Sequence, residues 1–280
     1  MKKLGRKLFY QLPPWLRFSA RRLFYLPLDT FHRIFRKRDG LTPPKGLIYT
    51  GSGDFKRIGR MQLQYFQQFC NLKPGGSVLD IGSGMGRSAI PLTAYLNEKG
   101  RYEGFDVVKR GVAWCKKNIT RHYPNFNFTF IPLNNDLYRS NGNASENFRF
   151  PYPDGSFDLI IVNSVFTHMV ADEVANYFKE MARVMKVGGV AYTTFFLYDE
   201  NSISFPSDFK FPFQYGHYRL MDDKVKSANV AFRKDYLEEN LIAANGFKIK
   251  HLFAGSWRGL PKEQCKEFQD LVIVEKKKIE

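Results

Sequence analysis

Residues 77–87 read Ser-Val-Leu-Asp-Ile-Gly-Ser-Gly-Met-Gly-Arg, within a chain of 280 residues. A short apolar run ends at Gly82, and an amphipathic segment, residues 88–96, follows the glycines at once. This order predicts a β-strand, a tight turn and a helix. Glycines in such a turn permit positive φ and let a ligand approach the backbone, and the N–H groups at the start of the helix then face that ligand. The stretch therefore predicts a ligand site at the end of a strand.

The spacing of the glycines indicates the kind of ligand. Dinucleotide-binding turns follow the pattern G-x-G-x-x-G, whereas this chain has G-x-G-x-G followed by Arg87. Asp80 precedes the first glycine by two residues, and its carboxylate would repel a pyrophosphate but suits a cationic ligand with an amino group. A second predicted strand, residues 102–105, ends at Asp106, about where a nucleotide-binding βαβ unit places its ribose-binding acid.

Four segments in this order resemble the motifs of the class I S-adenosylmethionine-dependent methyltransferases. Residues 78–87 are similar to the first motif, and residues 102–106 to the second-strand motif. Residues 150–160 resemble the approach to the fourth strand, and residues 183–189 the turn before the fifth. The resemblance implies a doubly wound, Rossmann-like α/β fold with a seven-stranded sheet, in which an antiparallel last strand inserts between the fifth and sixth. It also implies S-adenosylmethionine as cofactor and S-adenosylhomocysteine as product.

The periodicity of the remaining chain fits this plan. The predicted strands are 78–81, 102–105, 126–132, 157–162, 190–196, 247–253 and 269–274, and the predicted helices are 55–70, 88–98, 112–123, 172–185 and 233–245. Residues 198–230 have no clear period, and we expect an insertion there, where such enzymes usually build the substrate pocket. Gly51 and Gly53 beside Asp54 suit a lid over the cofactor, and the alternative is an ordinary helix N-cap at Asp54.

The resemblance assigns cofactor-binding roles to residues after the first four strands. Asp80 would reach the methionine end, with a turn-stabilising role as its alternative, and Asp106 would accept hydrogen bonds from the ribose hydroxyls. The adenine is expected against Val107. The full predicted set is Asp80, Gly82, Ser83, Gly84, Gly86, Arg87, Asp106, Val107, Leu133, Asn134, Asn163 and Ser164.

Methyl transfer from a sulfonium depends mainly on alignment, and in some cases on removal of a proton. His168 follows the fourth predicted strand, towards which the donor methyl points in the family, and a neutral imidazole can accept a hydroxyl proton near pH 7. The alternative is a histidine that caps or packs the next helix, and His217 is a second candidate base. No metal is expected, because no acid cluster resembles the magnesium site of catechol-type enzymes.

The basic charge of the chain is concentrated at its start. The net charge is +16, and residues 1–40 hold eleven Lys or Arg and two Asp, so they carry +9 and the other 240 residues carry +7. Leucines and aromatics at helical spacing alternate with these cations, among them Trp15, Phe18, Phe24, Phe31 and Phe35. We interpret residues 1–40 as a basic amphipathic extension ahead of a methyltransferase domain, residues 41–280. An anionic membrane surface suits such a helix; a nucleic-acid arm and a helix packed on the core are the alternatives.

The expected function is methyl transfer to a small-molecule or glycan- or lipid-linked acceptor, with a hydroxyl oxygen favoured because residues 254–275 resemble bacterial methyltransferases of glycan and secondary-metabolite pathways. Three widely spaced cysteines and the lack of eighteen consecutive apolar residues favour a cytoplasmic protein, peripheral on the inner face of the membrane if the extension is an anchor. One alternative is an RNA or other N-methyltransferase served by the basic arm, although no Asn-Pro-Pro-Tyr tetrapeptide follows strand four. Another is a non-catalytic, membrane-peripheral binding protein that kept the fold.

Overall fold

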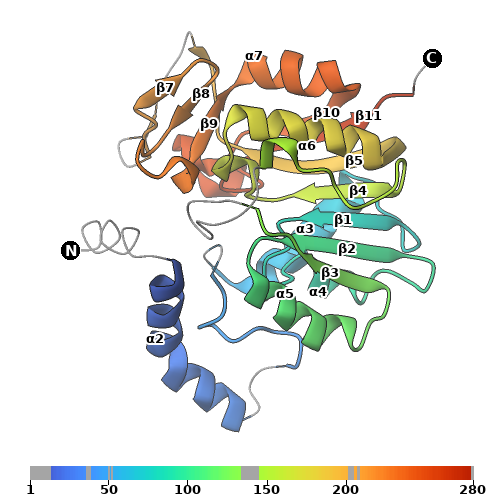
Figure 1. The fold of residues 1–280 in the computed structure, drawn as a ribbon, viewed down its shortest axis with the longest axis vertical. Helices are drawn as coiled ribbons and strands as arrows, with labels where there is room; N and C mark the ends of the chain where they lie inside the picture. The colour runs from blue at the N-terminus through green and yellow to red at the C-terminus, as the bar shows by residue number, and fades with distance from the viewer. Residues whose placement is uncertain are drawn as a thin grey trace.

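The computed structural model describes residues 14–35, 39–49, 51, 53–133, 145–200, 205–206 and 209–278. A seven-stranded sheet in the order β10-β11-β5-β4-β1-β2-β3 forms its centre (Figure 1). The strands are β1 Ser77–Ile81, β2 Arg101–Asp106, β3 Phe126–Phe130, β4 Phe157–Val162, β5 Met185–Phe195, β10 Phe247–Phe253 and β11 Asp270–Lys276. β11 is antiparallel to both β5 and β10, and it lies between them, as predicted. The strand order reverses beside β1, which is where open α/β sheets bind ligands.

The central strands are mostly apolar because both faces of the sheet are covered. In β4, Leu159 and Ile161 enter the core cluster that contains Phe66 of helix α3 (Phe55–Gln68). The alternate residues, Ile160 and Val162, enter the opposite cluster, where they join Phe178 of helix α6 (Ala171–Val184). The continuous apolar run therefore supplies two cores, and β4 has the predicted bounds.

Several helices are shorter or less regular than their periodicity predicts. The helix after β1, predicted to reach residue 98, is only α4 (Ala89–Leu92), and turns follow it. Helix α5 (Lys109–Cys115) continues as a π-helical turn through Thr120. Helix α7 (Lys234–Tyr236) continues as π- and 3-10-helical turns to Asn245. Gly246 ends this last segment with φ +75°, a conformation that favours glycine.

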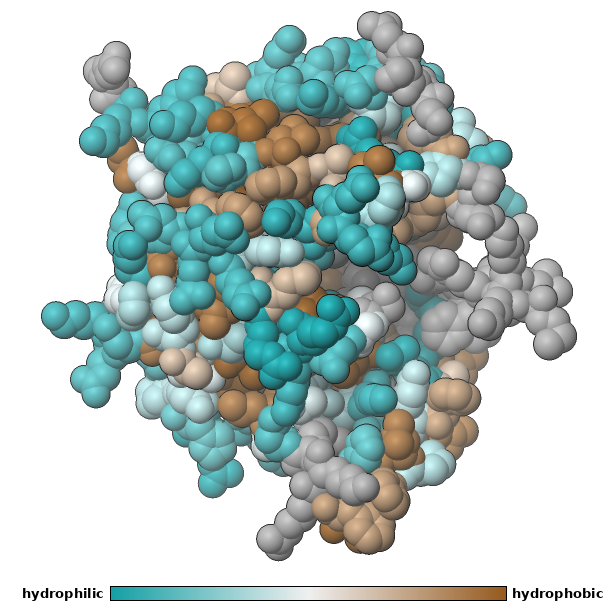
Figure 2. Space-filling model, turned by 180° about the vertical axis from the view of Figure 1, so that it is seen from behind, coloured by the Kyte–Doolittle hydropathy of each residue, from teal (hydrophilic) through white to brown (hydrophobic). Residues whose placement is uncertain are grey.

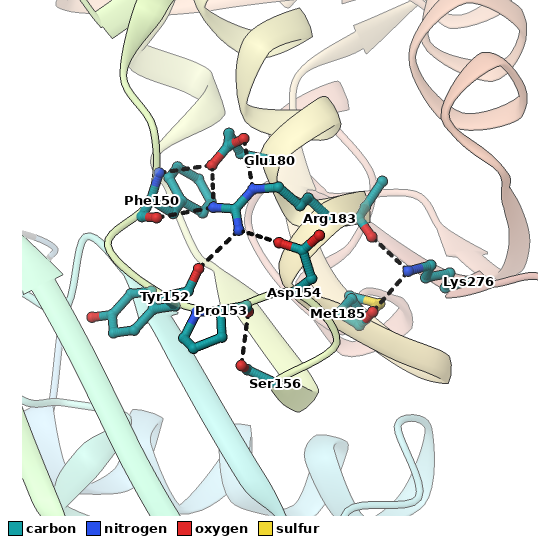
Figure 3. Close-up of polar contacts among 10 residues, drawn as sticks. Phe150, Tyr152, Pro153, Asp154, Ser156, Glu180, Arg183, Met185 and Lys276 are labelled. Atoms are coloured by element: carbon teal, nitrogen blue, oxygen red, sulfur yellow. Dashed lines mark hydrogen bonds and ion pairs between the residues drawn. The ribbon is translucent and has the colours of Figure 1, made fainter.

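Arg183 near the end of α6 fixes the segment that leads into β4 (Figure 3). Its guanidinium donates to the carbonyls of Phe150 and Tyr152 at 2.9 and 2.8 Å and pairs with Glu180 and Asp154. Glu180 also accepts a hydrogen bond from the Phe150 amide at 2.7 Å. The hydrogen bond to Glu180 raises the pKa of Arg183 further above its usual value, so the arginine remains charged.

Strand β5 begins at Met185, five residues before the predicted start, because Met185 pairs with Phe157 of β4.

The predicted insertion forms a second, four-stranded sheet in the order β6-β9-β8-β7. Its strands are β6 Leu197–Tyr198, β7 Phe213–Tyr215, β8 Tyr218–Leu220 and β9 Val230–Arg233. An aromatic cluster that includes Phe196, Phe211 and Trp257 packs beneath it. The fully buried Asp270 holds this region together, because it accepts hydrogen bonds from Trp257 Nε1 and from the amides of Gly255 and Leu197, each at 2.8 Å.

Helix α2 (Pro14–Ile34) lies at one end of the molecule, beside residues 39–49 (Figure 1). Asp29 accepts hydrogen bonds from the amides of Lys45 and Gly46 at 2.8 and 2.9 Å, which attaches the helix to this segment. Its Phe18 ring lies edge-on to Tyr49 with 5.7 Å between the centroids. In the part of the chain that the structure describes, no helix is both long and apolar enough to cross a membrane.

Candidate functional site

The predicted site residues gather in one cavity at the carboxyl ends of β1, β2 and β4. The cavity is lined by the predicted residues Asp80, Gly82, Ser83, Gly84, Arg87, Asp106, Val107, Leu133, Asn163, Ser164 and His168. Tyr49, Gly51, Phe55 and Ser88 also contribute to the wall. Asn134 lies outside the described residues. Because these strands meet where the strand order reverses, the sheet itself brings together residues from 49 to 177 along the chain.

The turn after β1 has the conformation that its glycines predict. Gly82 and Gly84 have φ values of +76° and +56°. The amides of Gly82 and Ser83 both donate to the carbonyl of Phe105, at 2.9 and 3.0 Å, so the turn is tied to β2. A Cβ atom on Gly82 would lie 2.5 Å from Val165 Cγ2, and this position therefore excludes a side chain.

Gly86, which was predicted to bind the cofactor, does not line the cavity in the structure. A Cβ atom there would lie 2.7 Å from Ile119 Cδ1 and 3.3 Å from Cys115 Sγ. Its φ of +75° and this close approach show that Gly86 allows the α5 region to pack against the turn. The residue therefore packs on the side of the turn that faces Cys115 and Ile119.

Asp80 is a buried carboxylate in the cavity wall and is only 3% exposed. Burial raises its pKa to about 7; the hydroxyl of Tyr102, which donates to Asp80 at 2.5 Å, opposes the rise, and the charge of Asp106 adds to it. A cation in the cavity would favour the ionised form of this side chain. Asp80 therefore suits the positively charged amino group that the sequence predicts for the ligand.

Asp106 is held in place by backbone amides. Its Oδ2 accepts from the Gly84 amide at 2.8 Å, and its Oδ1 accepts from the Val108 amide at 2.7 Å and from the Tyr49 hydroxyl at 3.2 Å. Burial raises the pKa of Asp106, and these hydrogen bonds oppose the rise. The carboxylate has about four acceptor positions, so part of its capacity remains for a ribose.

The cavity fits S-adenosylmethionine on observations of the structure itself. The buried Ser83 hydroxyl, which lines the cavity, has no hydrogen-bond partner among the described residues. Asp80 and Asp106 supply acceptors for an amino group and a ribose, and Val107 and Leu133 supply an apolar wall for the adenine. These residues would hold the cofactor in the order that the sequence predicts.

The loop after β4 forms the wall of the cavity where the sequence predicts the methyl acceptor. Ser164 lies in the left-handed region with φ +56°, and its hydroxyl donates to Gln269 at 3.0 Å while its amide donates to Thr194 at 2.7 Å. Four residues later, His168 Nδ1 lies 2.8 Å from the carbonyl oxygen of Ser227. Burial lowers the pKa of His168, while hydrogen bonds to the Ser227 and Ala228 carbonyls oppose this effect. The imidazole is therefore neutral at pH 7.

His217, the second candidate base, does not lie in the cavity. It is exposed, and its ring stacks on Tyr236 with a centroid distance of 4.5 Å. No described residue of the predicted substrate-pocket segment 198–230 lines the cavity either. The insertion instead contacts a lining residue of the cavity, because the carbonyl oxygen of Ser227 lies within hydrogen-bond distance of His168. Among the residues that the structure describes, no group of three or more His, Cys, Asp or Glu side chains could hold a metal ion.

The segment before α3 supplies wall residues whose individual roles the sequence does not predict. Asp54 caps α3 by accepting from the Arg57 amide at 2.8 Å, while Gly51 and Phe55 on either side line the cavity. Asp54 is therefore the N-cap of α3, and the lid over the cofactor stays a prediction. The Tyr49 hydroxyl donates to Asp106, which lies 57 residues further along the sequence. The only feature of the sequence that pointed to a role for this segment is the pair of glycines that follows Tyr49.

Comparisons with known proteins bear on the family of this chain. Residues 79–193 match the family described as a methyltransferase domain. The ubiquinone/menaquinone biosynthesis C-methyltransferase UbiE of Xanthomonas campestris is 27% identical over 134 residues, which are 48% of this chain and 47% of that protein. The arsenite methyltransferase of Mus musculus is 31% identical over 120 residues, covering 41% of this chain and 29% of that protein. The chain thus spans about half or less of the length of these curated relatives.

Solved structures extend the likeness to the fold beyond the matched segment. The PH0226 protein of Pyrococcus horikoshii aligns with a TM-score of 0.52 and 15% identity, over 89% of this chain and 99% of that one. The cyclase SpnF aligns with a TM-score of 0.51 and 16% identity, over 86% and 85% of the two chains. At such identities the likeness concerns the fold alone. Together with the cavity, the match of residues 79–193 to a methyltransferase domain and the methyltransferase relatives support a class I S-adenosylmethionine-dependent methyltransferase.

Proposed function

We propose that the protein transfers a methyl group from S-adenosylmethionine to a hydroxyl oxygen of a small-molecule or glycan- or lipid-linked acceptor. The observation that carries this proposal is the position of His168, which lines the cavity just past β4 with Nδ1 against the Ser227 carbonyl. When Nδ1–H donates to this carbonyl, the neutral tautomer leaves Nε2 as an acceptor. A hydroxyl held beside Nε2 could then lose its proton to His168.

The other residues of the cavity bind and orient. S-adenosylmethionine supplies an electrophilic methyl group on a positively charged sulfur. Asp80 and Asp106 would fix its two polar ends, and the backbone of the β1 turn would lie against it. Phe55 and Arg87 close the cavity on the side of residues 49–55, where the guanidinium lies 5.1 Å from the centre of the ring. Alignment and exclusion of water together account for most of the catalysis expected of such a site.

Carbon is a second candidate acceptor, favoured by the UbiE relatives, which are named C-methyltransferases. A ring that carries a hydroxyl group becomes nucleophilic at carbon when that group loses its proton. His168 would then act as the base in the same position, and only the atom that faces the donor methyl would differ.

The test uses the full chain with methyl-deuterated S-adenosylmethionine and fractionated cell extract. Production of S-adenosylhomocysteine is followed, and labelled products are identified by mass spectrometry. We expect a labelled O-methyl product that His168→Gln strongly reduces and that His217→Gln, on the exposed surface, leaves unchanged. A label on a ring carbon would favour the second candidate, and a label on RNA nitrogen would replace both. Cofactor binding without any turnover would indicate the non-catalytic alternative.

A further inference from the structure

Helix α2 turns its apolar side chains towards solvent. Of the eleven large hydrophobic residues that are exposed in the described part of the chain, six lie between residues 23 and 35: Leu23, Phe24, Leu26, Phe31, Ile34 and Phe35. Phe24 is 76% exposed and Leu23 is 71% exposed. Figure 2 shows hydrophobic side chains at the lower right edge of the molecule, over the end of α2. Patches of this kind on a surface mark a site of interaction.

The spacing of these residues places most of them on one face. Phe24, Phe31, Ile34 and Phe35 recur at intervals of three, four and seven residues. Together with Leu23, which precedes Phe24, they form what we call the outer face of α2, although Phe35 itself directly follows the last residue of the helix. The opposite side of the helix carries the groups that attach it to the protein, Phe18 against Tyr49 and Asp29 against the amides of residues 45 and 46. A surface helix normally buries its apolar face, so the orientation of α2 is inverted.

The charge beside the outer face indicates its partner. Helix α2 contains four arginines and one aspartate, a net charge of +3, and the extension to residue 40 carries +9. Arg22 and Arg33 are exposed, and Arg21 is partly exposed. A second copy of this helix would bring charge of the same sign, whereas an anionic lipid surface complements it. Long arginine side chains can reach lipid headgroups while neighbouring apolar residues enter the interface.

A groove beside α2 lies next to the cofactor cavity. It runs between α2 and residues 42–56 and is lined by the cations Arg21, Lys45, Lys56 and Arg87 and by the acids Asp29 and Asp54. Three of its lining residues, Gly51, Phe55 and Arg87, also line the cavity. The two hollows therefore adjoin at Gly51, Phe55 and Arg87, on the side of the cavity that faces α2.

We propose that α2 seats the protein on an anionic lipid bilayer, with its outer face in the interface and the groove open to that surface. Binding of α2 to a bilayer does not require methyl transfer. The docking proposal is therefore independent of which atom accepts the methyl group. Docking on a bilayer surface also explains why α2, which is not apolar enough to cross a membrane, exposes its phenylalanine side chains.

The first test is co-sedimentation of the full chain with vesicles of phosphatidylcholine alone or mixed with phosphatidylglycerol. Each basic residue near an anionic surface multiplies the partition coefficient by about five. Arg21, Arg22 and Arg33 together therefore predict that the chain prefers the mixed vesicles by about a hundredfold. Phe24→Ser/Phe31→Ser/Phe35→Ser should weaken binding by about thirtyfold or more. The matched control, Val187→Ser/Leu260→Ser, removes exposed apolar residues elsewhere and should bind as the wild type does.

Two further readouts separate docking from loss of fold and from catalysis. Titration with S-adenosylhomocysteine should give the same affinity for the triple variant and the wild type, because no substituted residue lines the cavity. A polarity-sensitive dye on Phe24→Cys, in a Cys265→Ser background, should shift to the blue on mixed vesicles. The same dye on Val187→Cys should not shift. Cys70 and Cys115 are buried, which restricts labelling to the introduced thiol.

The proposal is overturned if the chain binds mixed vesicles no better than neutral ones, or if the triple variant binds as the wild type does. A chain that ignores vesicles but binds single-stranded RNA through α2 would show that the helix is a nucleic-acid arm. Dimers that require Phe24 and Phe31 but not lipid would show that the face meets a second copy. In each of these cases cofactor binding would still test the proposed function separately.

Discussion

Acidification should weaken cofactor binding, because Asp80 must be ionised to hold a cationic ligand. The pKa of Asp80 is raised to about 7 in the empty cavity, mainly by burial. A bound ammonium or sulfonium group would lower this pKa, since opposite charges favour the ionised carboxylate. Binding and ionisation are then linked, and the protein releases a proton when the cofactor binds below pH 7.

The size of the effect follows from this pKa. The fraction of ionised Asp80 falls from about three-quarters at pH 7.5 to about 3% at pH 5.5, so affinity should fall about twenty-five-fold, or ~1.9 kcal/mol. At pH 6 about 0.9 proton should be released for each cofactor bound. We limit the measurement to pH 7.5 and below because the amino group of the cofactor itself loses its proton just above that pH.

Isothermal titration with S-adenosylhomocysteine in buffers of different ionisation enthalpy measures both quantities. The matched control is Asp80→Asn, which keeps an oxygen for Tyr102 but cannot ionise. Its affinity should be low and nearly independent of pH. The reasoning is refuted if Asp80→Asn shows the same pH dependence as the wild type, or if the wild type releases no proton at pH 6.

The same shift affects the stability of the empty protein. Asp80 ionises near pH 4 in the unfolded chain but near pH 7 in the folded one. The unfolded state therefore releases its proton first, and the contribution of Asp80 to stability is lost as pH rises from about 4 to 7, then stays constant. Urea unfolding of Asp80→Asn should lack this loss, so the variant should gain stability relative to the wild type as pH rises.

Four further substitutions test other parts of the structure. Asp106→Asn should weaken binding of S-adenosylhomocysteine by about 1.5–3 kcal/mol in calorimetry, and unchanged affinity would exclude the ribose role. Tyr49→Phe should tighten the same binding by less than about tenfold, because the hydroxyl competes for Asp106; weaker binding would instead show that Tyr49 holds the cofactor. His168→Ala should lower turnover by about a hundredfold in a coupled S-adenosylhomocysteine assay while cofactor affinity persists, and a loss of only a few-fold would contradict the base role. Arg183→Met should lower the free energy of unfolding by about 3 kcal/mol in urea, because it leaves Glu180 buried without its partner; an unchanged midpoint would contradict this account.

The cofactor half of the site could be predicted because its information is local. The turn after β1 and the end of β2 each lie within a few residues of sequence, and their glycine and carboxylate patterns specify both conformation and chemistry. β4 was predicted with its correct bounds because a strand buried on two faces is largely apolar, and only Asp158 interrupts the apolar run. The early start of β5 and the short α4 were not predicted, since pairing between Met185 and Phe157 and local turns decide them.

The acceptor half depends on contacts between distant residues, and His168 shows the consequence. Its place after the fourth strand could be predicted, but its tautomer depends on a carbonyl 59 residues away, in the insertion. For the proposed base, that contact would decide which nitrogen accepts a proton, so the second sheet would influence the chemistry without lining the cavity. Because β8 and β9 pair on either side of the turn that carries Ser227, the position of this carbonyl is set by strand pairing. A change in that turn should therefore alter the base while leaving cofactor binding intact, which follows from the physical separation of the two halves.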